Sequence, residues 1–454
     1  MEKEVGDHKK IVYFICLVGA LGGLLFGLDQ GFIANSLDTV KAIYHLDTKA
    51  AEQYSALLAT GGVLGALVSG VLARYLGRKK SLIFAGLLFT FGSLVSAWIP
   101  PLSILYVCRF FLGFGIGIAS FLSPLYLAET APASIRGSMG TLFQLMITIG
   151  IFLISATNVY IASVFPKSPM SLSLMFCVIV LFALLMLLTS FWLPESPRWL
   201  VLKGRGDEAA KILQRTVSKQ SEIDFEIIEI DKMLLRRGGL LKAVFQKSYL
   251  KVLLIGVVLQ MFQQLVGINV MIYYAPTIFG YAEMTGTLAK ILIPTVNMLF
   301  TFPAIYLVEK WGRKKLLYAG AAIMFVSMVA AGLAFQGIGQ STMVPPMLQI
   351  TLLIALVIYI FGFAFSWGPV AWLICSEIFP LKGRECGLTI TTMVNWTFAG
   401  LVMRYALSFM EIYGNASIFY LFAAFCVLAI LFVAFFIPET RGITLEKLEE
   451  KLSG

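Results

Sequence analysis

Charged side chains are scarce in this chain. They make up 13% of its 454 residues, whereas 59% of the residues are hydrophobic. A soluble protein of this composition could not cover its surface with groups that water solvates, so we expect a lipid bilayer to be its main solvent. The net charge of +10 does not indicate a nucleic-acid partner, because Lys and Arg form short clusters between long apolar runs instead of a continuous basic stripe.

Histidine and cysteine are also rare. The two histidines, His8 and His45, lie in the polar N-terminus and a short loop, so they assemble neither a metal site nor a histidine-based catalytic site. No nucleophile–base pair or nucleotide-binding loop is found, which argues against an enzyme, and we expect no cofactor. The cysteines show no CxxC motif and no paired spacing, so we expect buried, unpaired thiols at Cys16, Cys108, Cys177, Cys375, Cys386 and Cys426.

Apolar runs long enough to cross a bilayer, about 20 residues each, recur along the chain. We therefore predict an all-α integral membrane protein. Its twelve transmembrane helices are expected near residues 11–37, 54–73, 81–99, 102–127, 138–163, 171–193, 251–280, 288–309, 315–335, 347–376, 386–410 and 416–437.

A long polar interruption, residues 194–250, divides the spans into two sets of six. Its stretches KGRGDEAAKILQRTV and DFEIIEIDKMLLRR have the pattern of short amphipathic helices beside a membrane. We expect four parts: a six-helix bundle (1–193), a helical linker (194–250), a second six-helix bundle (251–437) and a tail (438–454).

The basic residues indicate orientation. Lys and Arg are concentrated in the N-terminus, the linker, the C-terminus and every second loop. The alternate loops hold few of them, at Lys41, Lys49, Lys167 and Lys290. By the positive-inside rule both termini and the linker are cytoplasmic. Short termini and outer loops favour a bacterial inner membrane, and we expect a monomer.

Three strings recur in the same order at nearly one offset. GRKK occurs at 77–80 and 312–315, an acidic residue seven positions before an arginine occurs at 129–136 and 377–384, and PESPR at 194 recurs as PETRG at 438. These recurrences indicate a duplicated six-helix unit. Parallel repeats of this kind place a substrate site between two bundles near the bilayer midplane.

The repeated charged residues have two interpretations. They are either topology signals alone, or a charge lock that holds the cytoplasmic ends together and breaks as the site opens inward. The candidate gating residues are Arg78, Glu129, Arg136, Glu309, Arg313, Glu377 and Arg384.

Asp29 and Arg109 lie inside apolar spans, where an uncompensated charge costs about 3 kcal/mol or more. They are either a static ion pair that fixes helix packing, or a carboxylate whose protonation is coupled to its release from the arginine. Arg404 has no obvious partner in the sequence, and we expect it to extend towards an interface.

Neutral polar and aromatic side chains gather in the spans. Amides can stitch transmembrane helices together, but several amides that converge with aromatic rings suit a sugar, whose hydroxyls donate and accept hydrogen bonds and whose C–H face stacks on rings. The amides are Gln144, Gln260, Gln263, Gln264, Asn269, Asn297 and Asn395, and the rings are Phe26, Tyr273, Tyr274, Trp372 and Trp396. Gly267, Pro276 and the pair Gly368–Pro369 are expected to break spans seven and ten beside this site.

The strings GRKK, PESPRWL, QQLVGINVMIYYAP, SWGPVAWLICSEIFPLKGR, NW and PETRG together resemble the signature set of the sugar porter family of the major facilitator superfamily. Through FGLD, SWGPVAWLICSEI and PLKGR the chain is similar to bacterial sugar–proton symporters for galactose, arabinose and xylose. It also resembles animal facilitative glucose transporters. The resemblance covers essentially the whole chain and implies the major facilitator fold.

The resemblance also implies residue roles. Asp29 and Arg109 match the symporters' coupling pair, and facilitative members are expected to have a neutral residue in place of Asp29. The sugar would contact or lie beside Phe26, Gln144, Gln263, Gln264, Asn269, Tyr273, Asn297, Trp372 and Trp396. We therefore expect a proton-coupled monosaccharide importer, with a facilitative uniporter of the same fold as the alternative; its partners are a hexose or pentose, a proton and the lipid bilayer.

Two positions depart from the family pattern. Ala399 stands where many hexose transporters have a second asparagine that touches the sugar, which leaves the sugar's identity open. Arg74 stands where an aspartate is common in the first-half loop motif. We therefore expect an acidic lock partner only in the second half.

Overall fold

A computed structural model describes residues 2–132, 135–216, 246–284, 287–339, 344–380 and 383–440. Across these ranges twelve helices are long and apolar enough to cross a membrane, as the sequence predicts. The protein is a multi-pass membrane protein built from helices. The observed helices often extend past the predicted spans: the first predicted span covers 11–37, whereas α1 covers Glu2–Tyr44.

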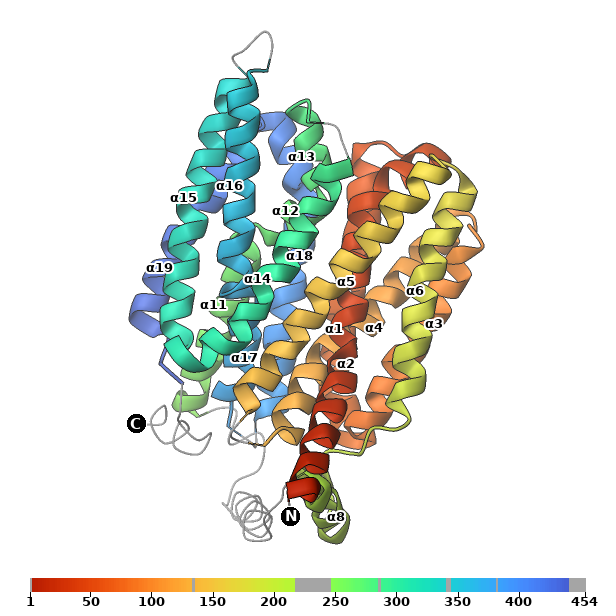
Figure 1. Ribbon diagram of the computed structural model, residues 1–454, viewed down its shortest axis with the longest axis vertical. Helices are drawn as coiled ribbons and strands as arrows, with labels where there is room; N and C mark the ends of the chain where they lie inside the picture. Colours follow the sequence, from red (N-terminus) through yellow and green to blue (C-terminus); the bar gives the residue numbers. More distant parts are fainter. Residues whose placement is uncertain are drawn as a thin grey trace.

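Two groups of helices lie side by side (Figure 1). The first half, coloured red to yellow, contains α1, α2 (Thr48–Leu76), α3 (Arg78–Ala97), α4 (Leu102–Thr130), α5 (Arg136–Val164) and α6 (Pro169–Ser190). The second half, coloured green to blue, contains α11 (Lys247–Leu265), α12 (Ile268–Tyr273), α13 (Ala275–Tyr281), α14 (Thr287–Trp311), α15 (Arg313–Gly339), α16 (Pro346–Ala364), α17 (Trp367–Ile378), α18 (Arg384–Tyr413) and α19 (Ser417–Phe436).

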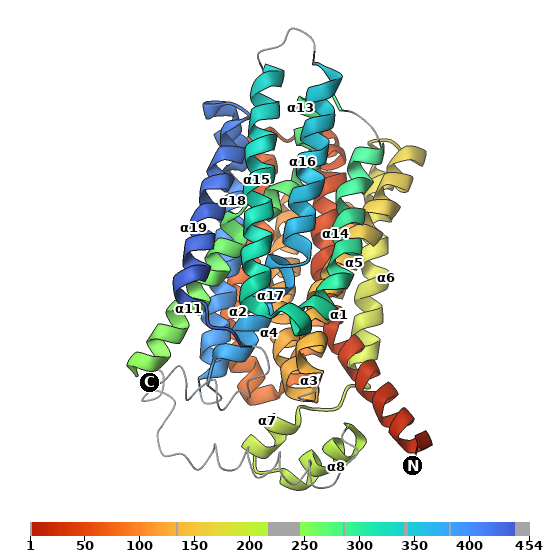
Figure 2. The ribbon, with the colours of Figure 1, turned by 60° about the vertical axis from the view of Figure 1, so that its left-hand side comes forward.

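Two short helices follow the first half. α7 (Pro197–Leu202) and α8 (Gly206–Thr216) lie at the end of the bundle where α1 begins, as Figure 2 shows. We call this end the terminal face and the other end the opposite face. α8 coincides with the first predicted amphipathic stretch, and the second stretch, DFEIIEIDKMLLRR, lies outside the described residues.

Glycines let α1 pack closely on α5. A Cβ atom at Gly27 or Gly31 would collide with the backbone of Ile147 or Ile151. Small residues at such crossings allow the dense packing that holds membrane helices together. Gln30 on α1 and Gln144 on α5 both line one pocket beside this crossing.

Both predicted helix breaks exist, but one lies elsewhere than expected. Span seven is divided at Gly267, which has a positive φ of 100°, and again at Tyr274. Span ten is divided at Phe365–Ser366, ahead of the expected Gly368–Pro369. Pro369 instead lies in the first turn of α17, where its missing N–H leaves no intrahelical bond unmade.

The cysteines are unpaired, but the expectation that all are buried is wrong. Cys16, Cys108, Cys375 and Cys426 are buried, whereas Cys177 is exposed and Cys386 is half-buried. Burial of the cysteines was inferred from their position in apolar spans. A residue in a span can face lipid instead of protein, and it is then exposed on the surface of the protein.

Candidate sugar pocket and ion pairs

Asp29 on α1 and Arg109 on α4 form a fully buried ion pair. One guanidinium nitrogen bonds Oδ1, and the other donates to Oδ2 at 3.2 Å. Both side chains have 0% exposure. The guanidinium also lies over the Tyr54 ring, 5.0 Å from its centroid. Each charge therefore compensates the other, which is the condition for holding them in a membrane interior.

Two tyrosines border this pair. The hydroxyls of Tyr54 on α2 and Tyr273 on α12 are buried and have no hydrogen-bond partner. Both residues lie close enough to Asp29 and Arg109 to interact with them electrostatically. Tyr273 belongs to the second half, so the ion pair of the first half is in contact with the other half.

A pocket between the two halves contains about 340 Å³ of space free of protein atoms, part of which is open to solvent. Amides and aromatic rings line it together with isoleucines. The predicted residues at the pocket are Phe26, Gln144, Gln263, Gln264, Asn269 and Trp372. The sequence analysis missed its other lining residues, which are Gln30, Ile147, Ile151, Ile268, Ile272 and Phe363.

The amides at the pocket bond to one another. Asn269 Nδ2 donates to Gln264 Oε1 at 2.5 Å, and Gln264 Nε2 donates to Asn395 Oδ1 at 3.2 Å. Asn395 Nδ2 in turn donates to Gln260 at 2.7 Å and to Gln263 at 2.5 Å. The buried amide donors and acceptors are thus largely satisfied within the second half.

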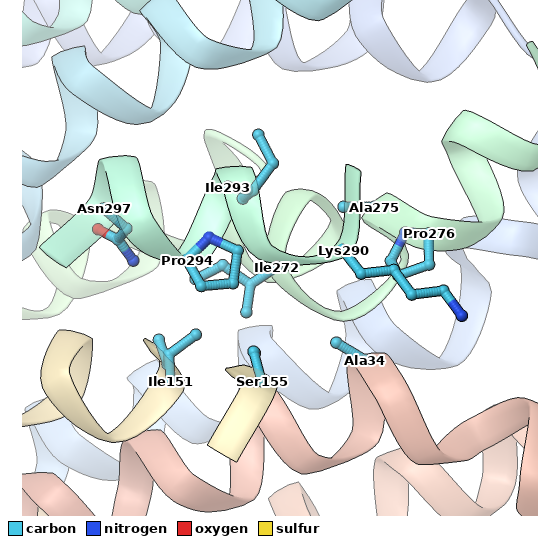
Figure 3. Close-up of a pocket in the computed structure, with 10 residues that line it drawn as sticks. All are labelled: Ala34, Ile151, Ser155, Ile272, Ala275, Pro276, Lys290, Ile293, Pro294 and Asn297. Atoms are coloured by element: carbon cyan, nitrogen blue, oxygen red, sulfur yellow. The ribbon is translucent and has the colours of Figure 1, made fainter. Parts of the chain in front are cut away.

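Three predicted sugar residues lie outside the pocket lining. Asn297 lines a neighbouring pocket together with Ser155 (Figure 3). The Nδ2 and Oδ1 atoms of Asn297 are buried and have no hydrogen-bond partner. Trp396 packs under Phe26, with ring centroids 4.7 Å apart. Tyr273 lies beside the ion pair. Asn297 is therefore next to the pocket, while Trp396 supports a ring that lines it.

At the terminal face the repeated strings form two matching clusters. Glu195 of PESPR accepts the backbone N–H groups of Arg78 at 2.7 Å and Lys79 at 3.3 Å, at the start of α3. Burial raises the pKa of the Glu195 carboxyl above its ordinary value. The hydrogen bonds that it accepts from backbone N–H groups lower the pKa and so oppose this shift. In the second half Glu439 of PETRG accepts from Arg313 at 3.0 Å, in the same way at the start of α15.

The arginines of the two GRKK strings complete these clusters. Arg78 binds Glu129 at 2.7 Å. Arg313 binds Glu377 at 2.9 Å and Glu309 at 3.6 Å. The duplicated order of the strings therefore corresponds to a duplicated set of contacts, with an acidic partner in each half. The expectation that only the second half has one is wrong, because Arg78 binds Glu129 as Arg313 binds Glu377; the loop carboxylate Glu309 alone has no counterpart, since Arg74 stands at that position.

The remaining predicted gating residues are arginines. Arg384 is buried, and its Nε donates to the Phe379 carbonyl at 3.3 Å. The side chain of Arg136 lies outside the described part of the structure.

Ion pairs join the two halves at both faces. At the terminal face Arg78 on α3 binds Glu385 on α18 at 3.1 Å. At the opposite face Glu52 on α2, which is fully buried, binds Arg404 on α18 at 3.3 Å and accepts the Ser408 hydroxyl at 2.8 Å. The expectation that Arg404 has no partner is therefore wrong. α18 is held to the first half near both of its ends.

Sequence comparisons identify relatives of this fold. The profile of the family described as "Sugar (and other) transporter" matches residues 15–452. The chain belongs to this family. The galactose-proton symporter of Escherichia coli (strain K12) is 38% identical over 456 residues, which cover 99% of this chain and 96% of that protein. For the arabinose-proton symporter of the same strain the identity is 33% over 455 residues, covering 99% and 95%.

Solved structures agree with this assignment. The proton:xylose symporter XylE of the major facilitator superfamily, bound to 6-bromo-6-deoxy-D-glucose, gives a TM-score of 0.87 at 30% identity and covers 98% of this chain and 100% of its own. The inward open XylE from E. coli gives 0.76 at 32% identity, with coverages of 97% and 99%. This family member therefore has the major facilitator fold and is a transporter, not an enzyme.

Proposed function

We propose that this protein is a proton-coupled importer of a monosaccharide, a hexose or a pentose, that works by alternating access. The observation that carries the proposal is the position of a buried carboxylate–guanidinium pair beside an amide-lined and aromatic-lined pocket between the two halves. The names of its relatives, symporters for galactose and arabinose, support the same substrate class.

The pocket suits a sugar chemically. Gln144, Gln264 and Asn269 can each donate to one hydroxyl and accept from another. The faces of Phe26 and Trp372 can pack against the C–H surface of a pyranose ring. We infer that the sugar binds here by replacing amide–amide hydrogen bonds with amide–hydroxyl bonds.

Asp29 is the proposed proton carrier. Protonation would remove its charge and weaken its bond to Arg109, and in a water-poor interior the loss of one partner from an ion pair has a large effect. A carboxylate that takes up its proton while the pocket faces outward, and loses it while the pocket faces inward, couples the proton gradient to sugar movement. The sugar and the proton then move in the same direction.

The moving bodies are the two halves. We assign residues 1–193 and 251–437 to bundles that rock about the pocket, residues 194–250 to a cytoplasmic linker and residues 438–454 to a cytoplasmic tail. Both termini are then cytoplasmic, in a bacterial inner membrane, and the protein acts as a monomer. Breaking the charge contacts at one face at a time would open the pocket to one side at a time.

Uptake by proteoliposomes tests the proposal. With an imposed inward proton gradient, the purified protein should accumulate radiolabelled D-galactose, L-arabinose or D-xylose, and a protonophore should abolish accumulation. Asp29→Asn keeps the shape of the carboxylate without its charge, so it should abolish accumulation but retain sugar binding. Asp38→Asn, which changes an exposed carboxylate on the same helix, is the matched control and should accumulate sugar normally.

Two results would contradict this assignment. Sugar uptake that equilibrates without accumulation, and that the protonophore does not change, would make the protein a uniporter. Protonophore-sensitive accumulation by Asp29→Asn would leave the Asp29–Arg109 pair with a structural role alone.

A further inference from the structure

Gln30 connects the proton site to the sugar site along a single turn of helix. It follows Asp29 directly in α1, is 5% exposed and lines the pocket between the halves. Successive helical residues point about 100° apart. The Asp29 side chain accordingly meets Arg109 on α4, while the Gln30 side chain meets Asn269 on α12.

The bond that Gln30 makes crosses between the halves. Its Nε2 donates to Asn269 Oδ1 at 2.9 Å, with both side chains buried. Among the described residues this is the one amide–amide hydrogen bond at the pocket that joins the first half to the second. Asn269 itself leads on to Gln264 and the amides beyond it. Gln30 is therefore the point at which α1 is attached to the amide network.

A sugar and Gln30 compete for the same acceptor. A hydroxyl that donates to Asn269 Oδ1 must displace Gln30 Nε2 or share the oxygen with it. The released amide then bonds the sugar or shifts with its segment of α1, and Asp29 lies on that segment. The charged and titratable groups around Asp29 are Arg109 on α4, Tyr54 on α2 and Tyr273 on α12, so a small shift changes its distance to all three.

We propose that Gln30 is the positioning residue that couples sugar binding at Asn269 to proton binding at Asp29. This inference rests on the proposed function, since it assumes that the pocket binds sugar and that Asp29 binds the proton. Coupling between two sites is reciprocal: if the sugar changes the proton affinity of Asp29, the proton changes the sugar affinity by the same factor. Removing Gln30 should therefore weaken both effects together.

The test measures binding and proton uptake on the purified full chain in detergent. D-galactose, or D-xylose if galactose does not bind, is titrated at several pH values, and proton uptake is read with an electrode in weakly buffered solution. Gln30→Met keeps the length and packing of the side chain but removes its hydrogen bonds. One lost hydrogen bond should raise the sugar Kd only about 2-fold to 13-fold.

The coupling should fall further than the affinity. In Gln30→Met the protons taken up per sugar should drop below about half of the unmodified value, and the pH dependence of Kd should flatten. Gln30→Asn shortens the side chain by one methylene, so that its amide cannot reach Asn269, and it should give the same loss. This second variant keeps the test valid if Gln30→Met does not fold. Asn35→Leu is the matched control, because the Asn35 amide donates within its own helix to Gly31, and it should keep full coupling.

The possible failures are distinguishable. If the unmodified protein binds sugar without proton uptake, the proposed function fails and this inference with it. If the unmodified protein takes up protons and both Gln30 variants do so equally, Gln30 is not the coupling residue and the proposed function stands.

Discussion

At the scale of single residues, the polar side chains in and around the pocket differ in how well their hydrogen-bonding groups are satisfied. Gln264, Asn269 and Asn395 each have amide partners, whereas the Asn297 carboxamide and the Tyr273 hydroxyl are buried without any. Buried polar groups without partners are costly, so such groups usually serve a ligand or a water. We propose that the partnered amides exchange partners when a sugar enters, while the unpartnered groups lie just outside the pocket lining.

The first residue-scale prediction concerns sugar binding. Gln264→Ala and Asn269→Ala should each weaken binding by about 1–3 kcal/mol, because a desolvated hydroxyl and the remaining amide both lose a partner. Isothermal titration of the purified variants measures this change.

Gln336→Ala is the control, since this amide on α15 contacts Tyr420 at an exposed site. Unchanged affinity in both pocket variants, with correct membrane insertion, would show that these amides only hold helices together.

Some contacts of the site could be predicted from the local sequence and others could not, because only some residues lie where the local sequence requires a partner. Asp29 and Arg109 stand inside apolar runs, where a charge requires a partner, so their pairing could be expected. Glu52 lies in the second turn of α2 and Arg404 in the last third of α18, and nothing in either local sequence indicated that they meet. Gln30 is one amide in the string FGLDQG, and its importance depends on Asn269, 239 positions away. Partners brought together only by the tertiary fold leave no local pattern.

At the scale of helices, the broken spans decide how the pocket is enclosed. The turn at Gly267 ends α11 and redirects α12, which carries Asn269 and Tyr273 to the boundary between the halves. The glycine has φ of 100°, a conformation that other residues adopt only with strain. Its Cα also faces the Phe422 ring on α19, so no side chain fits there.

The element-scale prediction is that Gly267→Ala destabilises the protein. Backbone strain of about 1–3 kcal/mol adds to the overlap with Phe422. The thermal transition in detergent, followed by fluorescence-detected size exclusion, should fall clearly. Gly280→Ala in α13 is the control, because its Cβ would meet nothing within 4 Å, and it should melt like the unmodified protein. Equal melting of the two variants would mean that the turn at Gly267 tolerates a side chain.

Sequence patterns located the helices better than their breaks. Length and hydropathy fix a membrane span strongly, because a bilayer admits few alternatives. A break depends on backbone geometry, and residues that can break a helix need not do so where they stand. Pro369 was expected to mark the break in span ten, yet it lies inside α17, and the chain turns three residues earlier at Ser366.

At the scale of the whole molecule, ion pairs join the two halves at both faces. Glu385 binds Arg78 at the terminal face, and Glu52 binds Arg404 and Ser408 at the opposite face. Arg313, Glu309 and Glu377 pair within the second half, and the side chains of Glu309 and Arg313 also lie against Gly137 on α5 of the first half.

The last prediction follows from the presence of one inter-half ion pair at each face. Two neutral substitutions, one at each face, should shift the conformational equilibrium of the transporter in opposite directions. Glu385→Gln removes a contact that joins the halves at the terminal face, so it should favour the conformation open at that face. Glu52→Gln weakens the contact at the opposite face and should favour opening there. A loss of about 1.4 kcal/mol from one closed face changes the ratio of conformations about tenfold, because the equilibrium depends directly on the difference between the two states.

Spin-label distances can separate the two effects. In a background without the native cysteines, exposed positions Lys80 and Lys315 report the terminal face, and Lys49 and Met347 report the opposite face. Glu385→Gln should lengthen the first distance and leave the second short, and Glu52→Gln should do the reverse. Both variants keep Asp29, Arg109 and the pocket amides, so sugar binding should persist. If both substitutions lengthen the same distance, or neither changes one, then closure does not depend on these ion pairs, and apolar packing between the halves must set the conformational equilibrium instead.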